Sequence, residues 1–283
     1  MARRGSLRRR LVLLLTLALV AGGIYTAVTF LQRSEVLITE RCTAVGGSSD
    51  DLAADQAANA GLIAAVAVRR GLPARAASIA LATAMQESKL RNIGHGDEAG
   101  PDSRGLFQQR PSQGWGTTDQ VMDPHHASNA FYDALVKIPG FQNMAITDAA
   151  QRVQRSAYPN AYAAHEPMAR AFASALTGQT PAGLDCTLRD PDAAGDPAAV
   201  QDRLTADFGA IPATTEARSL VLETEGAQAW AVAQWAVANA KVLSVTEVQV
   251  DGRQWSRQKR NGWQPAEMPA GLLRITVAEE PAR

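Results

Sequence analysis

The chain has few cysteines, few aromatic residues and no excess of charge of either sign. Lysine plus arginine and aspartate plus glutamate each number 28, so the formal net charge is zero. A chain without a basic surplus has no overall field that attracts nucleic acid, and we expect no nucleic-acid partner. The four histidines are scattered, and no Cys/His cluster has metal-ligand spacing. The sequence therefore predicts no metal site and no cofactor.

The N-terminus combines a basic stretch with a long uncharged run. The run covers residues 11–31 and follows five arginines: Arg3, Arg4, Arg8, Arg9 and Arg10. At about 1.5 Å per residue it is long enough to cross a hydrocarbon core of roughly 30 Å. The arginines place the N-terminus in the cytoplasm, which predicts a single-pass cell-membrane protein with its bulk outside. The alternative is a cleaved signal peptide, for which Ala21-Gly22-Gly23 offers a cleavage site.

The only two cysteines, Cys42 and Cys186, lie far apart in the sequence. In an oxidising compartment, an even and widely spaced pair suggests one disulfide. It would join the start and the end of the intervening segment, which makes that segment a plausible domain. The alternative is two reduced cysteines.

Apolar periodicity and breaker residues divide the chain into two folded parts. Helices are expected at 54–70, 75–90, 126–137, 148–156 and 160–176. Beyond Cys186 the pattern predicts a short helix near 197–208, strands at 218–223, 242–250 and 272–277, and an amphipathic helix at 226–240. The fold prediction is an all-α domain after one transmembrane helix, followed by a small α+β domain. The predicted boundaries are 1–10 (basic tail), 11–31 (transmembrane), 32–53 (tether), 54–186 (all-α), 187–215 (linker) and 216–283 (α+β).

Glu87 is the most distinctive candidate for chemistry. It ends an alanine-rich helix, apolar nearly all round, and precedes a long polar loop at 91–124, so we expect it on the floor of a cleft. A carboxyl group partly removed from water has a raised pKa, as general-acid cleavage of a glycosidic bond near neutral pH requires. The alternative is a surface carboxylate paired with Lys89 or Arg91.

Two motifs around Glu87 resemble the lysozyme-like lytic transglycosylases. The first is Gln86-Glu87-Ser88, and the second is Ser103-Arg104-Gly105-Leu106-Phe107-Gln108-Gln109. That family has Glu-Ser at a helix end and then Gly-Leu-Met-Gln after a loop. The stretches 109–116 and 153–158 are similar to the actinobacterial and phage-tail branch. The resemblance covers about 60–177.

The resemblance implies a lysozyme-like fold for the all-α domain and a role for each matching residue. Glu87 would be the catalytic acid and then the base, and Ser88 would orient it or the sugar. Phe107 would stack on a sugar face, and Gln108 would bond N-acetyl or hydroxyl groups. Tyr158 would support the catalytic carboxyl. Trp115, in a glycine-flanked loop, also suits sugar stacking, although it, Phe107 and Gln108 each have a purely structural alternative.

Three positions depart from the family pattern. Phe107 replaces the usual methionine, Pro159 interrupts the Ala-Tyr-Asn-Ala motif, and Ala127 stands where an asparagine is common. No carboxylate of the loop (Asp97, Glu98 or Asp102) has a clear partner spacing to Glu87. One carboxylate suffices if the N-acetyl group of the muramic residue assists departure of the leaving group, which leads to a 1,6-anhydro product. Attack by water would instead make the enzyme a muramidase.

The sequence therefore predicts a membrane-anchored enzyme that cleaves the MurNAc-GlcNAc bond of peptidoglycan glycan strands. The alternative is a non-catalytic wall-binding or envelope-assembly module. In the C-terminal part, Trp230 and Trp235 are expected in the core. Trp255 and Trp263 flank the basic segment 256–260, which suggests either a surface for anionic polymer or an envelope-protein partner, or a solvated hairpin tip.

Overall fold

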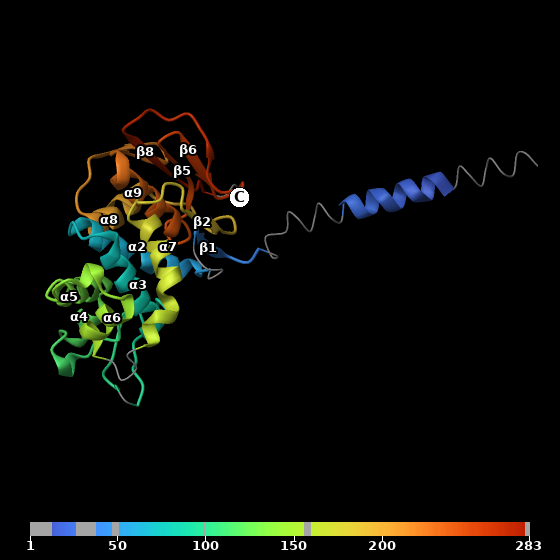
Figure 1. Ribbon diagram of the computed structural model, residues 1–283. Helices are drawn as coiled ribbons and strands as arrows, with labels where there is room; N and C mark the ends of the chain where they lie inside the picture. Colours follow the sequence, from blue (N-terminus) through green and yellow to red (C-terminus); the bar gives the residue numbers. More distant parts are fainter. Residues whose placement is uncertain (1–12, 27–37, 47–50, 99, 156–159, 281–283) are drawn as a thin grey trace, which may run out of the picture. The chain divides into compact units, whose positions relative to one another are not determined.

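The computed structural model describes residues 13–26, 38–46, 51–98, 100–155 and 160–280 (Figure 1). The chain divides into two units, Met1–Thr39 and Glu40–Arg283. In the first unit, residues 13–26 are helical. The sequence predicted a transmembrane helix at 11–31, but no helix in the described ranges is both long and apolar enough to cross a membrane.

The second unit begins with a helical half that follows the predicted pattern closely. Gly71 and Pro73 separate the first two helices, as expected for breaker residues. Asp123 caps the helix Pro124–Leu135 by accepting from the His125 amide. The predicted helix at 160–176 is divided into a 3-10 turn and α7. The helices are α2 (Ala54–Arg69), α3 (Ala74–Ser88), α4 (Thr118–Met122), α5 (Pro124–Leu135), α6 (Ile146–Gln154), η4 (Ala161–His165) and α7 (Glu166–Leu176).

Two antiparallel sheets complete this unit. The smaller pairs β1 (Arg41–Ala44) with β2 (Leu184–Thr187), and the larger has six strands in the order β3-β4-β8-β5-β6-β7. In β8, Leu273, Ile275 and Val277 are buried and alternate with more exposed residues, as expected for a sheet with one covered face. The other strands are β3 (Ala213–Glu216), β4 (Ser219–Glu223), β5 (Val245–Val250), β6 (Arg253–Ser256) and β7 (Gln264–Pro265), and α8 (Pro197–Phe208) precedes them.

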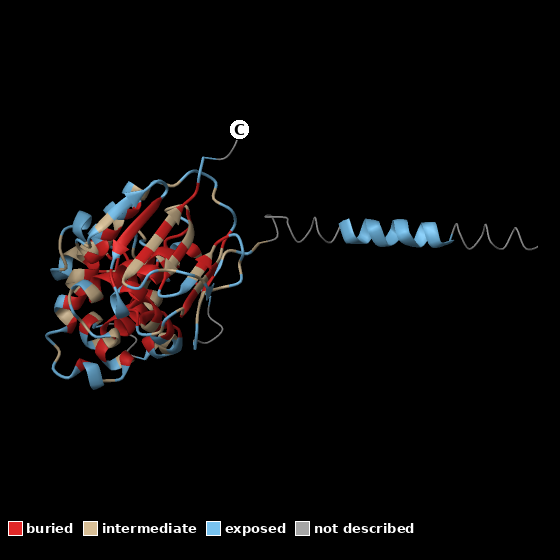
Figure 2. Ribbon diagram, turned by 90° about the horizontal axis from the view of Figure 1, so that it is seen from above, coloured by how far each residue is buried: buried red, intermediate tan, exposed pale blue. Residues whose placement is uncertain are grey.

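Helix α9 (Gly226–Ala238) joins the helices to the sheet. It packs against α2 and α7 and also against β2, β5 and β8. Every residue from Ala229 to Ala238 is buried, and Figure 2 shows the buried residues running through the centre of this unit. The predicted amphipathic helix is therefore apolar nearly all round, as a helix enclosed on both sides must be.

This packing overturns the predicted fold class. The unit from Glu40 onward is mixed α/β, with two sheets, rather than an all-α domain followed by a separate α+β domain. The prediction failed because it gave α9 only one buried face. The segment 187–215, expected to be a linker, contributes α8, which packs against α2 and β4.

A buried carboxylate also ties the two halves together. Asp207 on α8 is fully buried and accepts a hydrogen bond from the Trp235 indole at 2.7 Å. His125 Nε2, at the start of α5, lies 2.7 Å from the other carboxylate oxygen. Because a buried carboxylate needs such partners, this cluster fixes α5, α8 and α9 together.

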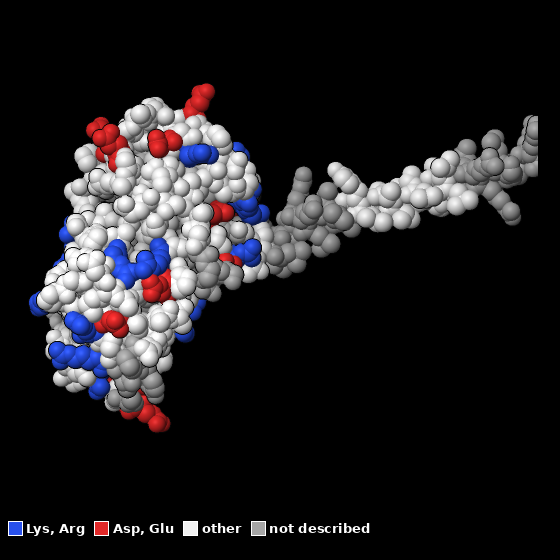
Figure 3. All heavy atoms as spheres, in the orientation of Figure 1, with Lys and Arg blue, Asp and Glu red and all other residues white. Residues whose placement is uncertain are grey.

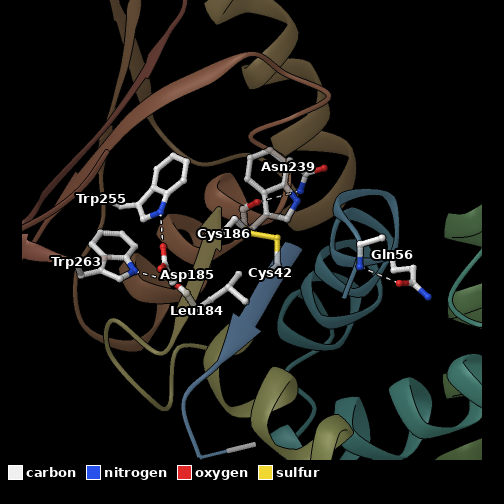
Figure 4. The surroundings of a disulfide bond; sticks show 10 residues. Cys42, Gln56, Leu184, Asp185, Cys186, Asn239, Trp255 and Trp263 are labelled. Atoms are coloured by element: carbon white, nitrogen blue, oxygen red, sulfur yellow. Dashed lines mark hydrogen bonds between the residues drawn. A yellow bond between two sulfur atoms is a disulfide. The ribbon is translucent and has the colours of Figure 1, made fainter. Parts of the chain in front are cut away.

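The predicted disulfide between Cys42 and Cys186 is present (Figure 4). The two cysteines face each other across the β1–β2 ladder, and both are buried. On its other side, Cys42 exchanges backbone hydrogen bonds with Leu52, just before α2. The bond therefore connects the chain entering the helical half to the chain leaving it.

Strand β2 is also where the C-terminal tryptophans attach (Figure 4). Trp255 Nε1 donates to Asp185 Oδ1, and Trp263 Nε1 donates to the Leu184 carbonyl, both at 2.8 Å. Trp255 is completely buried, and Trp230 and Trp235 lie in the core as predicted. The indole groups of Trp255 and Trp263 therefore hold the larger sheet to β2.

The basic segment 256–260 is bound into the fold as well. Arg257 is 3% exposed and donates to the Ala240 carbonyl at 2.8 Å, and Arg260 donates to the Leu188 carbonyl at 3.0 Å. Neither predicted reading of this segment, a polymer-binding surface or a solvated hairpin tip, fits these two arginines. Both guanidinium groups donate hydrogen bonds to backbone carbonyls inside the unit.

Candidate active site

Helix α3 presents Glu87 on its last turn. Its alanine-rich sequence lets α3 lie close to α2 and α7, and most of the helix is buried. The helix ends at Lys89, whose φ of 55° is left-handed. Two amides of α2 hold this end, because Gln56 donates to the Lys89 carbonyl and Asn59 donates to the Leu90 carbonyl. Glu87 therefore stands on a helix end that is held in place.

The carboxyl group of Glu87 is partly buried and hydrogen-bonded. The Tyr162 hydroxyl donates to Glu87 Oε1 at 2.7 Å. Burial raises the pKa of Glu87, hydrogen bonds from Tyr162 and Gln154 lower it, and the negative charge of Asp97 raises it, with a net shift upward. A carboxyl with this balance keeps its proton to a higher pH than an exposed glutamate does.

The alternative role for Glu87, a surface ion pair, is not found. Arg91 pairs instead with Asp55 on α2 at 2.6 Å. In the described part of the chain, no ion pair joins Glu87 to Lys89 or Arg91. Glu87 therefore lies partly buried at the edge of the polar loop, where the sequence places it.

A cleft of about 1130 Å³ opens in front of Glu87. The end of α3, the loop that follows it, and the ends of α5 and α6 provide its walls. Amide side chains are its most common feature: Gln86, Gln108, Gln109, Gln113 and Gln154 all line it. Trp115, which is partly exposed, lines the same cleft.

Neighbouring glutamines of the Gly-Leu-Phe-Gln-Gln segment reach this cleft in different ways. Gln108 has a left-handed φ of 49°, and its side chain donates to the Gly105 carbonyl at 3.2 Å. Gln109 is 2% exposed and donates to the Ala127 carbonyl at 3.0 Å. Within the described residues, Gln109 Oε1 is buried and has no hydrogen-bond donor, so this acceptor is left unpaired.

Ser88 and Phe107 have structural roles rather than the predicted contacts to substrate. Ser88 is buried and donates to the Leu106 carbonyl at 2.7 Å, which fastens the end of α3 to the second motif. Phe107 is completely buried and stacks on Phe131 with ring centroids 4.7 Å apart. A ring enclosed in the core cannot stack on a sugar, so that part of the prediction is wrong. The Phe107 carbonyl accepts from Gln154 and thereby positions an amide of the cleft.

The tyrosine that supports Glu87 is Tyr162, which was not among the residues predicted from the sequence. Tyr158, the predicted partner, lies outside the described residues. Tyr162 is fully buried in η4, and the next histidine of this turn, His165, lies 2.9 Å from Gln86 Oε1 through Nε2. The available signal was a second tyrosine four positions after the first, within the segment that precedes α7.

The acidic residues of the loop have separate roles. Asp97 lines the cleft, and its Oδ1 accepts from the Gly100 amide at 2.8 Å. Asp102 accepts hydrogen bonds from Ser112 and pairs with Arg110, and these contacts keep its pKa well below the usual range. Asp97 is therefore the second carboxylate of the cleft, and Asp102 holds the loop together. Among described residues, no group of three or more His, Cys, Asp and Glu side chains is placed to hold a metal ion.

No protein-family model matches the sequence, and no curated protein matches it either. The resemblance to lytic transglycosylases therefore depends on the motifs themselves. The chemistry of the site is set by Glu87, by Tyr162 and by the cleft in front of Glu87.

Proposed function

We propose that this chain is a glycosidase of the lytic transglycosylase or muramidase type, which cleaves the MurNAc-GlcNAc bond of peptidoglycan. Glu87 acts as the general acid and then as the base. The observation that carries the proposal is a partly buried carboxyl with a raised pKa, held by Tyr162, that faces a long amide-lined cleft. Efficient general acids have a pKa near the operating pH, and burial supplies that shift here.

The amide side chains of the cleft suit a polymer backbone that carries hydroxyl and amide groups. Glutamine side chains both donate and accept hydrogen bonds, so they match the hydroxyl and N-acetyl groups of amino sugars. Gln108, Gln109 and Trp115 line one continuous cleft with Glu87. Trp115 is partly exposed and can cover an apolar sugar face.

Glu87 is the donor or the acceptor in each proton transfer of the proposed reaction. Glu87 gives its proton to the bridging oxygen as the C1–O bond of the muramic residue breaks, and the leaving strand departs as an alcohol. The N-acetyl group of the muramic residue assists that departure. The Glu87 carboxylate then takes a proton from the sugar's C6 hydroxyl, which closes a 1,6-anhydro ring, or from a water molecule that attacks C1. Either route returns Glu87 to its protonated form.

The disulfide supports a location where this substrate occurs. Structural disulfides persist in oxidising compartments and are rare in the cytosol. The Cys42–Cys186 bond is buried in the unit that also holds Glu87. An extracytoplasmic location would bring the cleft to the cell wall.

Release of soluble fragments from purified peptidoglycan tests the proposal. We expect the full chain to release fragments and Glu87→Gln to release almost none, with both proteins sedimenting with the polymer. If neither protein releases fragments while both still sediment, the chain is a wall-binding or assembly module instead. Altered family motifs, such as the buried Phe107, are the observation that favours this second candidate.

Removal of the Tyr162 hydroxyl should shift the pH profile of the enzyme. This hydroxyl stabilises the charged carboxylate and lowers the pKa of Glu87 against the effect of burial. Tyr162→Phe therefore raises that pKa further. Because activity falls as the acid loses its proton, the basic limb of the profile of kcat/KM should move to higher pH.

A matched control for this prediction is Tyr132→Phe. Tyr132 is fully buried and donates to the Ile63 carbonyl at 2.9 Å, away from Glu87. Both variants lose one buried hydroxyl, but only Tyr162→Phe should move the limb. Equal profiles for the two variants would mean that Tyr162 does not act on Glu87.

A further inference from the structure

Three basic side chains line the cleft beside Glu87. Lys137 follows the end of α5, Arg152 lies on the last turn of α6, and Arg155 caps that helix with a left-handed φ of 53°. All three are exposed. They belong to the helical half and reach the cleft at its α5 and α6 wall.

These three cations have no carboxylate partner among the residues that the structure describes. In contrast, Arg110, the fourth cation of the cleft, is neutralised by Asp102 at 2.8 Å. The carboxylates of the cleft are Glu87 and Asp97, and Glu87 has a raised pKa. The lining is therefore positive, although the whole chain is neutral and Figure 3 shows basic and acidic side chains interspersed on the face it presents.

A helix C-terminus attracts cations in any case, so Arg152 and Arg155 alone could simply stabilise α6. Lys137 follows the C-terminus of α5 in the same way, so the helix dipole accounts for each cation singly. It does not account for all three lining one cleft from two different helices. An amino-sugar polymer without acidic groups offers these three residues hydroxyl and carbonyl acceptors but no opposite charge. A polymer with a carboxylate on every second sugar offers one to each sugar pair that occupies the cleft.

We propose that Lys137, Arg152 and Arg155 bind carboxylates attached to the muramic residues of the strand, so that the enzyme selects an acidic amino-sugar polymer over a neutral one. This inference rests on the proposed glycosidase function. The carboxylate has two sources: the lactyl ether of an unsubstituted muramic residue, or the peptide that extends from it. Both present the same group to an arginine or a lysine.

Binding measurements with the full chain carrying Glu87→Gln test this inference without relying on turnover. The probes are neutral chitin oligosaccharides, glycan strands freed of peptide, and strands that keep their peptides. At low salt we expect the acidic strands to bind roughly tenfold more tightly than chitin. Added salt should reduce this difference, because exposed charges are screened.

The test variant is Arg152→Gln with Arg155→Gln, and the matched control is Arg253→Gln with Lys259→Gln. The control removes the same charge from exposed residues outside the cleft. The test variant should lose about three- to tenfold in affinity for acidic strands and keep its affinity for chitin. Equal losses in both variants would overturn the proposal.

The three probes separate the two sources of the carboxylate. If peptide-free strands bind more tightly than chitin, the lactyl group supplies the carboxylate. If only strands that keep their peptides bind more tightly than chitin, the peptide supplies it. Equal affinity for chitin and both strands would contradict the proposal. Tighter binding of single-stranded DNA than of any glycan would also contradict the proposal, if the test variant loses this binding to DNA. A wild-type chain that binds acidic strands but cleaves none would overturn the enzyme function alone.

Discussion

Glu87→Gln should lower the rate of peptidoglycan cleavage by roughly 10²- to 10⁴-fold, the usual contribution of a positioned general acid. The glutamine keeps the shape of the side chain and can still accept the Tyr162 hydrogen bond. It has no proton of the required acidity to give to the glycosidic oxygen. The measurement is kcat/KM on purified peptidoglycan, with Glu98→Gln as the control, because Glu98 is exposed in the same loop and does not line the cleft.

The stability of the same variant separates lost chemistry from lost folding. The pKa of Glu87 is raised in the folded chain above its ordinary value of 4.5. Such a group contributes stability below the unfolded pKa and loses it as the pH rises through the folded pKa. We therefore expect Glu87→Gln to raise the Tm at pH 7 and to leave it unchanged near pH 3.5. Lost activity with a lowered Tm at pH 7 would point to misfolding and not to a missing acid.

Loss of the disulfide should produce the largest change in stability. The bond closes a loop with a sequence separation of 144 residues. In the chain-entropy model, opening a loop of that length costs about 5 kcal/mol, and measured values are typically about 2–4 kcal/mol. Cys42→Ala with Cys186→Ala should therefore lower the free energy of unfolding by about 2–5 kcal/mol. Alanine is preferred to serine because both positions are buried and a hydroxyl there would lack a partner.

Urea titration of the full chain with and without a reductant measures this effect. Reductant should lower the midpoint of the wild type to that of the double variant and leave the variant unchanged. The structure contains no other cysteine, so the variant is an internal control for effects of the reductant itself. A difference below about 0.5 kcal/mol between the two proteins would show that the β1–β2 ladder holds without its cross-link.

Residues with strong local signals were predicted well. The helix at 54–70 was read from its apolar pattern and the stop at Gly71 and Pro73, and it agrees with α2 within one residue. The disulfide followed from cysteine spacing and compartment, and Glu87 from its place between an apolar helix and a polar loop. These inferences use neighbours in the sequence, which the sequence displays directly.

Other features depend on contacts between distant segments. Strands β1 and β2 are four residues each and pair only because the fold brings them together, so neither has a pattern of its own. Helix α9 was misread because its second buried face is covered by β2, β5 and β8, and that packing made the two predicted domains one unit.

The two aromatic errors at the site have a similar cause. Phe107 matches a motif position that suggests a sugar contact, but Phe131 of α5 covers its ring. Tyr162 and Tyr158 are near each other in the sequence, and only the turn of η4 places the Tyr162 hydroxyl on Glu87. Tertiary packing decided that the Phe107 ring is buried and that the Tyr162 hydroxyl reaches Glu87.

Mass spectrometry of the new glycan ends tests the central claim most directly. Purified peptidoglycan is incubated with the wild type or with Glu87→Gln, and the released fragments are identified. The account predicts new ends at muramic residues in the wild type alone: 1,6-anhydro ends if the C6 hydroxyl attacks, or reducing ends if water attacks, with Asp97 as the second carboxylate facing the cleft. Fragments without new muramic ends, or equal fragments from both proteins, would contradict it.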